Sequence, residues 1–267
     1  MDYKDIILER KDGVATLTLN RPEKLNAVSN RMMSNELPDA FDIIERDDDI
    51  KVLILTGAGD RAFCTGADVS ERLATRLAGQ KIETTRWETI QPVGWIGTPL
   101  YRLRKPAIAA VNGIAAGAGA ALPMLCDIRI ASENARFSFV FVKRGIIPDC
   151  GSTYLLPRIV GTAKAIELMW SGEIIDAKEA ERVGLVNKVV PQDKLMSEAM
   201  DYALRLAHGP SVAIEMIKWS TRASWSNNFE QQLEFESRAQ RLCMSTEDFE
   251  EGYKSFVEKR EPHFKGK

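Results

Sequence analysis

The sequence is poor in the residues that build metal centres and disulfide frameworks. Its 267 residues include four cysteines, with no CxxC pair among them, and two histidines that lie far from these cysteines in the chain. Structural zinc sites and disulfide-stapled folds place such residues at short, characteristic spacings. We therefore expect no metal site and interpret all four cysteines as reduced thiols: Cys64, Cys126, Cys150 and Cys243.

Long apolar runs are also missing. No apolar segment reaches the ~18 residues that a membrane-spanning helix needs, and no N-x-S/T sequon occurs. Residues 1–10 are rich in charge and do not show the basic-then-apolar order of a secretory signal. We expect a cytoplasmic protein with no membrane partner.

The chain has no excess of charge of either sign. Lysine and arginine total 36 against 38 acidic residues, which gives a net charge of −2. No global field attracts nucleic acid or an anionic membrane, so any anion site must be local. The predicted helix 30–46 carries four acidic residues and no lysine. Phosphate would be repelled there, and we expect no nucleic-acid partner.

Two runs of small residues are the most informative feature that is present. CTGAD at residues 64–68 and NGIAAGAGAA at residues 112–121 each follow an apolar β-type segment and precede a helix-like one. A Gly/Ala turn from strand to helix leaves backbone N–H groups unpaired at the positive end of the helix dipole. One such run alone more often reflects close backbone packing. Two together favour an oxyanion hole, in which both turns donate to one ligand oxygen.

The hydrophobic pattern predicts an α/β fold, because strands and helices alternate along most of the chain. From residue 193 onward the pattern is helical throughout, with breaks at residues 209–210 and 227–228 and a last helix over 247–259. The segment 71–104 contains Trp87 and Trp95, which could line a pocket or pack as satellites of the core. The other expected elements are a hairpin (6–8 and 14–19, around residues 12–13), strands (52–56, 107–111, 128–131, 186–190) and helices (30–46, 118–125, 163–171, 177–183).

Further motifs occur along the whole chain. NRPEKLNAVS (20–29), RAFCTGADV (61–69), AAGAGAALPMLCDIRIA (115–131) and FVEKREPHFKG (256–266) together resemble the crotonase (enoyl-CoA hydratase/isomerase) superfamily. Within it, the whole run from AAGAGAA (115–121) through FVFVKRGIIPDCG (139–151) is most similar to the bacterial ring-epoxide and enoyl-CoA isomerases of phenylacetate degradation. The resemblance implies a spiral of ββα units over residues 1–192 and a C-terminal helical trimerisation region over 193–267.

The resemblance also implies an acyl-CoA thioester substrate and a homotrimer or a dimer of trimers. Coenzyme A is then the substrate carrier, and no other cofactor is expected. The residues that match the carrier-binding positions are Lys24, Leu25, Ala27, Ala67, Asp68, Val69, Gly117 and, donated by an adjacent subunit, Phe256 and Lys259. A solvated basic C-terminus is the alternative interpretation of the last two residues.

The resemblance also implies which residues of this chain occupy the catalytic positions of the family. The backbone N–H groups of Ala67 and Ala118 match the oxyanion donors, whereas the two glutamate positions of the hydratases hold Ala121 and Phe141, which cannot titrate. Asp149 stands where other branches place their working carboxylate, and it is our predicted acid and base. Its structural alternative is the N-cap of a helix that begins near Ser152.

These assignments favour an enoyl-CoA isomerase, because one carboxylate suffices to move a proton between two carbons. The same arrangement would serve a ring-epoxide-CoA isomerase. Hydration of an enoyl- or dienoyl-CoA by the same Asp149, a hydrolase, and a non-catalytic acyl-CoA-binding protein stay open. We expect apolar neighbours around the carboxyl group from Phe139, Phe141 and Ile147. We assign Cys150 to core packing and Asp68 and Asp127 to structural roles.

Overall fold

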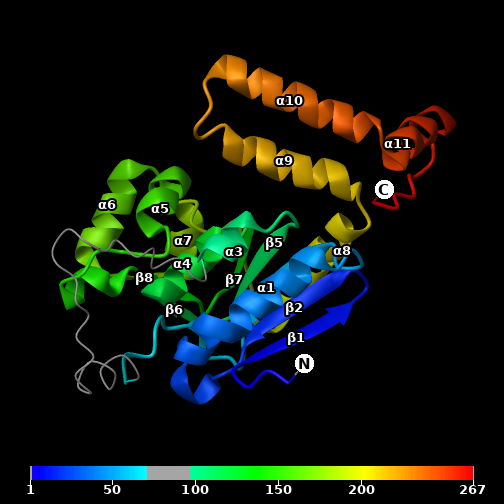
Figure 1. Ribbon diagram of the computed structural model, residues 1–267. Coiled ribbons are helices and arrows are strands. Elements are labelled where there is room, and N and C mark those ends of the chain that lie inside the picture. The colour runs from blue at the N-terminus through cyan, green and yellow to red at the C-terminus, as the bar shows by residue number, and fades with distance from the viewer. Residues whose placement is uncertain (1, 71–96, 267) are drawn as a thin grey trace.

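Two β-sheets form the centre of the computed structural model, which describes residues 2–70 and 97–266 (Figure 1). The six-stranded sheet has the order β1-β2-β3-β5-β7-β10, and the four-stranded sheet has the order β4-β6-β8-β9. The strands are β1 (Ile6–Lys11), β2 (Val14–Leu19), β3 (Val52–Gly57), β4 (Ala62–Cys64), β5 (Ala107–Val111), β6 (Ile114–Ala116), β7 (Ile128–Ser132), β8 (Arg136–Ser138), β9 (Ile174–Asp176) and β10 (Lys188–Val190).

The chain alternates between the two sheets as it advances. β3, β5 and β7 pair in parallel within the large sheet, and each is followed directly by a strand of the small sheet: β4, β6 and β8. A helix follows each of the last two pairs before the next strand of the large sheet. This repeat is a spiral of ββα units, so the predicted α/β class and spiral are confirmed.

The hairpin and the central strands form as their sequences predict. β1 and β2 pair antiparallel, and the turn residues Asp12 and Gly13 have φ of 50° and 78°. Two left-handed residues give the two-residue turn whose twist suits a hairpin, for which Asp-Gly is a preferred pair. All six residues of β3 are buried, as is typical of parallel strands covered on both faces.

Helices cover both faces of the large sheet (Figure 1). Side chains of β3 alternate between two core clusters, and α8 packs its Leu195, Ala199 and Ala203 against one of them. The predicted helix 30–46 contains a π-turn, η2 (Met32–Glu36), before α1 (Leu37–Arg46), which lies on the other face. The remaining helices are η1 (Pro22–Lys24), α3 (Gly97–Arg102), α4 (Ala118–Leu125), η3 (Val140–Arg144), α5 (Ser152–Val160), α6 (Thr162–Ser171), α7 (Ala177–Arg182), η4 (Gln192–Lys194), α8 (Leu195–Ala207), α9 (Ser211–Ala223), α10 (Phe229–Met244) and α11 (Glu247–Glu258).

The small sheet is the part of the fold that our predicted elements omit. Each of its four strands has three residues, and two of them lie inside or beside the small-residue runs that we interpreted only as turns. A three-residue strand is too short to show a period of two, so the pattern carries no signal for it.

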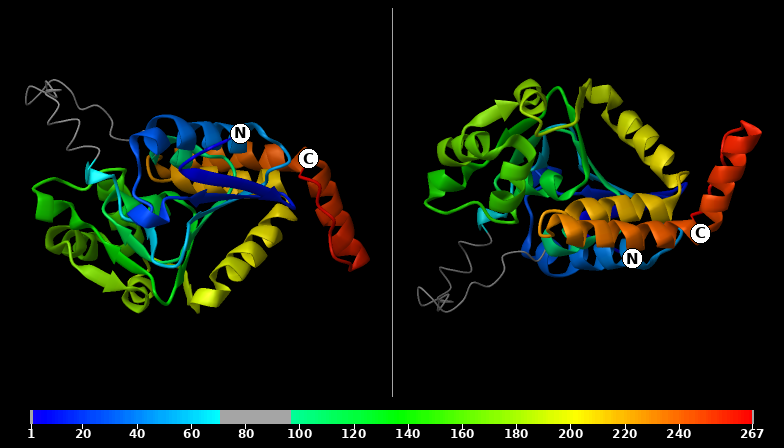
Figure 2. Two further views of the ribbon diagram at one scale, coloured as in Figure 1. Left: turned by 90° about the horizontal axis from the view of Figure 1, so that it is seen from below. Right: turned by 90° about the horizontal axis from the view of Figure 1, so that it is seen from above.

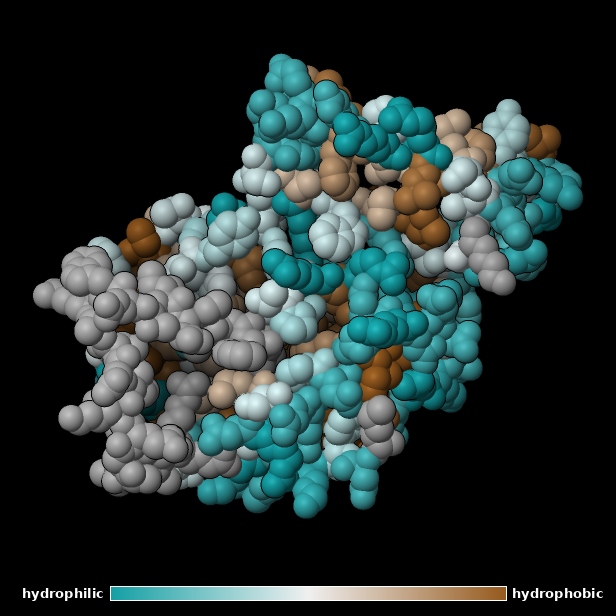
Figure 3. Space-filling model, viewed as in Figure 1, coloured by the Kyte–Doolittle hydropathy of each residue, from teal (hydrophilic) through white to brown (hydrophobic). Residues whose placement is uncertain are grey.

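Helices α9, α10 and α11, which we call the C-terminal arm, lie to one side of the sheets in Figure 1, and α11 projects beyond them in Figure 2. Neither α9 nor α10 contains a fully buried residue. The space-filling view shows hydrophobic side chains on this arm (Figure 3). Its exposed large hydrophobic residues include Ile217, Phe229, Leu233, Leu242, Met244, Tyr253, Phe256 and Val257.

A partly buried polar cluster connects the arm to the rest of the chain. Asp127, which directly precedes β7, pairs with Lys218 at 2.7 Å and with Arg222 at 2.7 Å, and both cations come from α9. Lys218 also donates to the carbonyl of Lys105 at 2.7 Å. The structural role predicted for Asp127 is therefore confirmed. None of the helices within residues 2–70 and 97–266 is long and apolar enough to cross a membrane.

Candidate active site

A cavity of about 230 Å³ brings together the three predicted catalytic positions, Ala67, Ala118 and Asp149. The first follows β4, the second begins α4 and the third precedes α5, so three distant segments of the chain converge. The full lining among the described residues is Val28, Met33, Thr65, Gly66, Ala67, Val69, Gly117, Ala118, Leu122, Val140, Phe141, Arg144, Ile146, Asp149 and Cys150.

The backbone around Ala67 leaves its N–H available to the cavity. Val28 bridges to this segment by donating to the carbonyl of Gly66 at 2.8 Å and accepting from the N–H of Asp68 at 2.9 Å. Ala67 lies between these two groups, so its own N–H points away from Val28. This N–H donates no hydrogen bond to any residue in the described ranges.

The second donor is the first residue of a helix. Ala118 is at position N1 of α4, where an N–H has no partner inside the helix, and no described residue outside it accepts from this group. Gly117 precedes it with φ of 56° and ψ of −130°, a conformation that is essentially restricted to glycine. The helix N-terminus adds its partial positive charge at this point of the cavity.

The two turns touch through glycine. A Cβ atom added to Gly119 would lie 2.0 Å from the carbonyl oxygen of Cys64, and one added to Gly66 would lie 3.3 Å from the backbone nitrogen of Ala118. Only residues without a side chain allow this approach. The small-residue runs therefore do both things that we considered for them: they pack closely, and they place two backbone donors beside one cavity.

Two buried asparagines stabilise the backbone around β4 by hydrogen bonds, and our sequence analysis did not identify them. Asn26 donates to the carbonyl of Ala62 at 2.7 Å, and Asn112 donates to the same carbonyl at 3.2 Å. Asn112 also donates to the carbonyls of Gly57 and Gly59 at 2.9 and 2.7 Å. Each asparagine occurs in a motif that we examined, NRPEKLNAVS and NGIAAGAGAA, so a polar residue beside a small-residue turn was the available signal.

Asp149 lies in the turn before α5, and its side chain does not cap that helix. The N-cap is Gly151, with φ of 80°, and no side chain caps the helix. Only the main-chain carbonyl of Asp149 takes part, accepting from the N–H of Ser152 at 2.9 Å and from its hydroxyl at 2.7 Å. The N-cap alternative is therefore wrong, and the residue lines the cavity instead.

The surroundings of Asp149 differ in part from those we expected. Phe139 is fully buried in the core and Ile147 is 79% exposed, and neither lines the cavity. The expectation that these two residues form the apolar wall beside Asp149 is wrong, because Phe139 packs into the hydrophobic core and Ile147 faces solvent. Phe141 does line the cavity, together with Leu122 and Ile146.

Neither hydratase glutamate position supplies a carboxylate. Ala121 lies one turn into α4 and is fully buried, and Phe141 forms part of the cavity wall. Among the described lining residues, Asp149 carries the sole carboxylate. The possible pocket residues Trp87 and Trp95 lie outside the described residues.

The predicted carrier-binding residues from the N-terminal half lie close together. Arg21 connects the two segments, since its guanidinium donates to the carbonyl of Ala27 at 2.8 Å and pairs with the Asp68 carboxylate at 3.0 Å. The Thr65 hydroxyl donates to the carbonyl of Leu25 at 3.3 Å. The segment that carries Lys24, Leu25 and Ala27 is thereby joined to the one that carries Ala67, Asp68 and Val69. The carboxylate of Asp68 accepts from the N–H of Ser70 at 3.1 Å, as its predicted structural role requires.

Phe256 and Lys259 lie elsewhere. Phe256 is on α11 and is 81% exposed, and Lys259 ends that helix in the left-handed conformation. Neither lines the cavity that holds Asp149. Their contact with a carrier bound to a neighbouring subunit stays a prediction.

The thiols differ in their surroundings. Burial raises the pKa of Cys64 and of Cys126 to about 12, so both remain protonated at neutral pH. Cys150 packs against the core as expected, but it also lines the cavity, where we did not expect it. Within the described parts of the chain, no group of three or more potential ligands could hold a metal ion.

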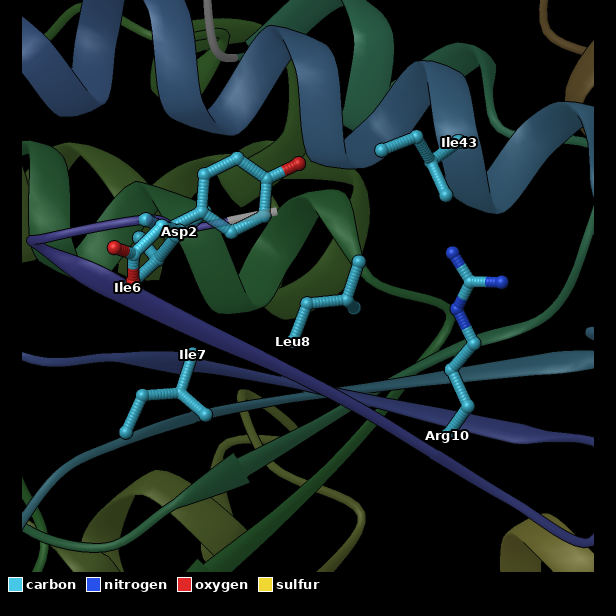
Figure 4. A pocket seen from close by; sticks show the side chains of 7 residues that line it. Asp2, Ile6, Ile7, Leu8, Arg10 and Ile43 are labelled. Atoms are coloured by element: carbon cyan, nitrogen blue, oxygen red, sulfur yellow. The ribbon is translucent and has the colours of Figure 1, made fainter.

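A second, larger hollow of about 560 Å³ lies between β1 and α1 (Figure 4). Ile6, Ile7, Leu8 and Arg10 from β1 and Ile43 from α1 line it. Arg10 is already paired with Asp47. No predicted catalytic or carrier-binding residue lies there, so the smaller cavity is the candidate active site.

Comparison with known proteins finds similar chains that match almost the full length of this one. The family model described as enoyl-CoA hydratase/isomerase matches residues 9–267. The chain is 39% identical over 267 residues to a 1,2-epoxyphenylacetyl-CoA isomerase of Escherichia coli K12, with 98% of each chain covered. It is 39% identical over 265 residues to a short-chain-enoyl-CoA hydratase of Clostridium acetobutylicum, with 97% of each covered. The crystal structure of an enoyl-CoA hydratase from Bacillus anthracis superposes with a TM-score of 0.89 at 34% identity, covering 99% of this chain and 100% of that one.

Proposed function

The chain belongs to the enoyl-CoA hydratase/isomerase family, and from that premise we propose that it isomerises an enoyl-CoA or a ring-epoxide CoA ester. The observation that carries the proposal is the cavity in which two backbone donors meet Asp149, the one carboxylate among its described lining residues. Two donors suit an enolate oxygen, and one carboxylate suits a proton that leaves and returns.

The proposed reaction uses three groups of this chain. The thioester carbonyl accepts hydrogen bonds from the N–H groups of Ala67 and Ala118, which stabilise negative charge as it develops on the oxygen. Asp149 removes the proton from C2 of a 3-enoyl thioester, which leaves a conjugated enolate. The resulting carboxylic acid returns the proton to C4, and the double bond then lies between C2 and C3. The proton count balances without water or a further reactant.

Coenzyme A acts as the carrier in this proposal, and the reaction needs no metal ion or redox cofactor because substrate and product have the same oxidation state. We propose that Lys24, Leu25, Ala27, Ala67, Asp68, Val69 and Gly117 contact the carrier within one subunit. A cytoplasmic location and a division into a catalytic region (1–192) and a helical oligomerisation region (193–267) belong to the same proposal.

Hydration is the second candidate, since relatives of similar identity are named hydratases. The two activities separate in an assay that supplies 3-enoyl-CoA and 2-enoyl-CoA independently. We expect isomerisation of a 3-enoyl ester to outrun water addition to a 2-enoyl ester, because the cavity offers water an apolar wall beside Asp149. Hydration faster than the isomerisation of every 3-enoyl ester supplied would replace our proposal by a hydratase with Asp149 as its base.

The double variant Ala121→Glu/Phe141→Glu also tests the balance between isomerisation and hydration, because it restores the two glutamates of the hydratases. We expect it to raise hydration relative to isomerisation, because two added carboxylates can hold and deprotonate a water molecule. The matched control is Ala121→Gln/Phe141→Gln, which adds similar volume without the charge. Since unpartnered buried carboxyls cost several kcal/mol, the ratio is measured on protein that circular dichroism shows to be folded.

A trimer or a dimer of trimers is our expectation for the assembly. The C-terminal arm exposes large apolar side chains that a monomer leaves in water, among them Phe229 at 72% and Phe256 at 81%. We expect light scattering to give three or six times the chain mass. A stable monomer that turns over acyl-CoA would contradict the assembly.

The variant Phe256→Ala/Lys259→Ala tests the predicted carrier contact of α11. We expect it to weaken coenzyme A binding. Unchanged affinity would contradict the roles of Phe256 and Lys259.

A further inference from the structure

Arg144 introduces a positive charge into an otherwise largely apolar part of the cavity wall. It is the last residue of η3, and Gly145 follows it with φ of 68°. It lines the cavity together with Phe141 and Ile146. Arg144 and Asp149 are the two charged residues among the described residues that line this cavity. The proposed reaction uses Asp149 and leaves Arg144 without a role.

The described residues offer the guanidinium of Arg144 no partner. It forms no hydrogen bond or ion pair within residues 2–70 and 97–266. By contrast, Arg21 is paired with Asp68, and Arg222 is paired with Asp127. A guanidinium presents five donors in a planar fork that matches a carboxylate. Arg144 therefore has the donors, the access and the charge to bind an anion in the cavity.

The position of Arg144 along the chain indicates which part of a substrate it meets. The predicted carrier-binding residues near the cavity are on segments 24–27 and 67–69 and at Gly117. Arg144 belongs instead to segment 140–150, which carries Asp149 and much of the apolar wall. The part of the cavity that the described residues line has a volume of about 230 Å³, which suits a short acyl group.

We propose that Arg144 binds a carboxylate at the far end of the acyl group, so that this site takes the mono-CoA thioester of a short dicarboxylic acid. The inference rests on the proposed function for the placement of the thioester in the cavity. Arg144 is a specificity residue in this arrangement. It fixes the end of the acyl chain while the two backbone donors hold the carbonyl and Asp149 faces the carbons between them.

The test measures binding of unreactive, saturated thioesters by titration calorimetry, so it does not depend on turnover. The probes are mono-CoA esters of dicarboxylic acids with four to eight carbons, each compared with the ester whose free carboxylate is replaced by a carboxamide. We expect the wild type to bind at least one carboxylate ester about tenfold or more tightly than its carboxamide partner. We expect Arg144→Met to bring that ratio close to one and Arg144→Lys to give an intermediate ratio.

Lys143→Met is the matched control. Lys143 precedes Arg144 on η3 and is also exposed, but it does not line the cavity, and its Cε atom lies beside Gly172. We expect this variant to keep the wild-type ratio. Equal binding of both esters at every chain length, or a preference that survives in Arg144→Met, would overturn the proposal.

Free coenzyme A separates the acyl group from the carrier as the source of the anion. If Arg144→Met weakens free coenzyme A as much as the dicarboxylyl ester, the guanidinium binds carrier phosphates and our proposal is wrong. Failure of the isomerase assay with a normal carboxylate preference would instead contradict only the proposed function. The two failures are therefore distinguishable.

Discussion

Replacing Asp149 with asparagine is expected to lower turnover by at least about 10²-fold, the usual effect of removing a general acid or base. Among the described lining residues no other carboxylate stands near the two backbone donors. Asparagine keeps the shape of the side chain but cannot accept and return a proton. The affinity for an acyl-CoA should change little, because the thioester is held by backbone N–H groups and the carrier by other segments.

The measurement is the steady-state rate with a 3-enoyl-CoA, together with the exchange of deuterium from solvent into a bound acyl-CoA. Asp201→Asn, an exposed carboxylate on α8, is the control for a change of net charge. A non-catalytic binding protein would show no exchange in either the wild type or the variant. Wild-type turnover in Asp149→Asn would show that Asp149 is not the acid and base.

Long, strongly patterned segments of the fold were accessible from the sequence. The turn at Asp12 and Gly13 could be predicted because Asp-Gly tolerates the two left-handed conformations that a hairpin needs. β3 and β5 are continuous apolar runs, as buried parallel strands require, and their predicted bounds agree with the structure to within one residue. The small sheet was not accessible, because strands of three residues exist only through pairing with partners far along the chain.

Some residues of the candidate active site could be predicted from the sequence, and others could not. The two oxyanion turns could be predicted because glycine is required where Gly119 faces the carbonyl of Cys64. This requirement is visible in the sequence as a run of small residues. Asp149 could not be distinguished from a helix N-cap by local pattern, and only the family resemblance favoured a catalytic role. The contributions of Asn112 and Arg144 depend on which distant segments face them, and no spacing along the chain encodes that.

Replacing Ala118 with proline is expected to lower kcat by about 10²–10³-fold, the effect of losing one oxyanion donor in comparable sites. Proline lacks the backbone N–H, and at N1 of a helix this loss costs no intrahelical hydrogen bond. The fixed φ of proline is also suited to the first helical position. The substitution therefore removes the donor that we assign to the enolate oxygen while leaving α4 able to form.

Ala118→Gly is the control, since it changes the side chain at the same position and keeps the N–H. We expect the glycine variant to retain activity within about tenfold, because its main cost is the lower helix propensity of glycine. Thermal unfolding of both variants shows whether α4 is still packed, as its seven buried residues require. Should a folded Ala118→Pro enzyme isomerise its substrate at the wild-type rate, the oxygen cannot be held at the N-terminus of α4. The negative charge would then have to be stabilised by Ala67 and groups other than the second turn.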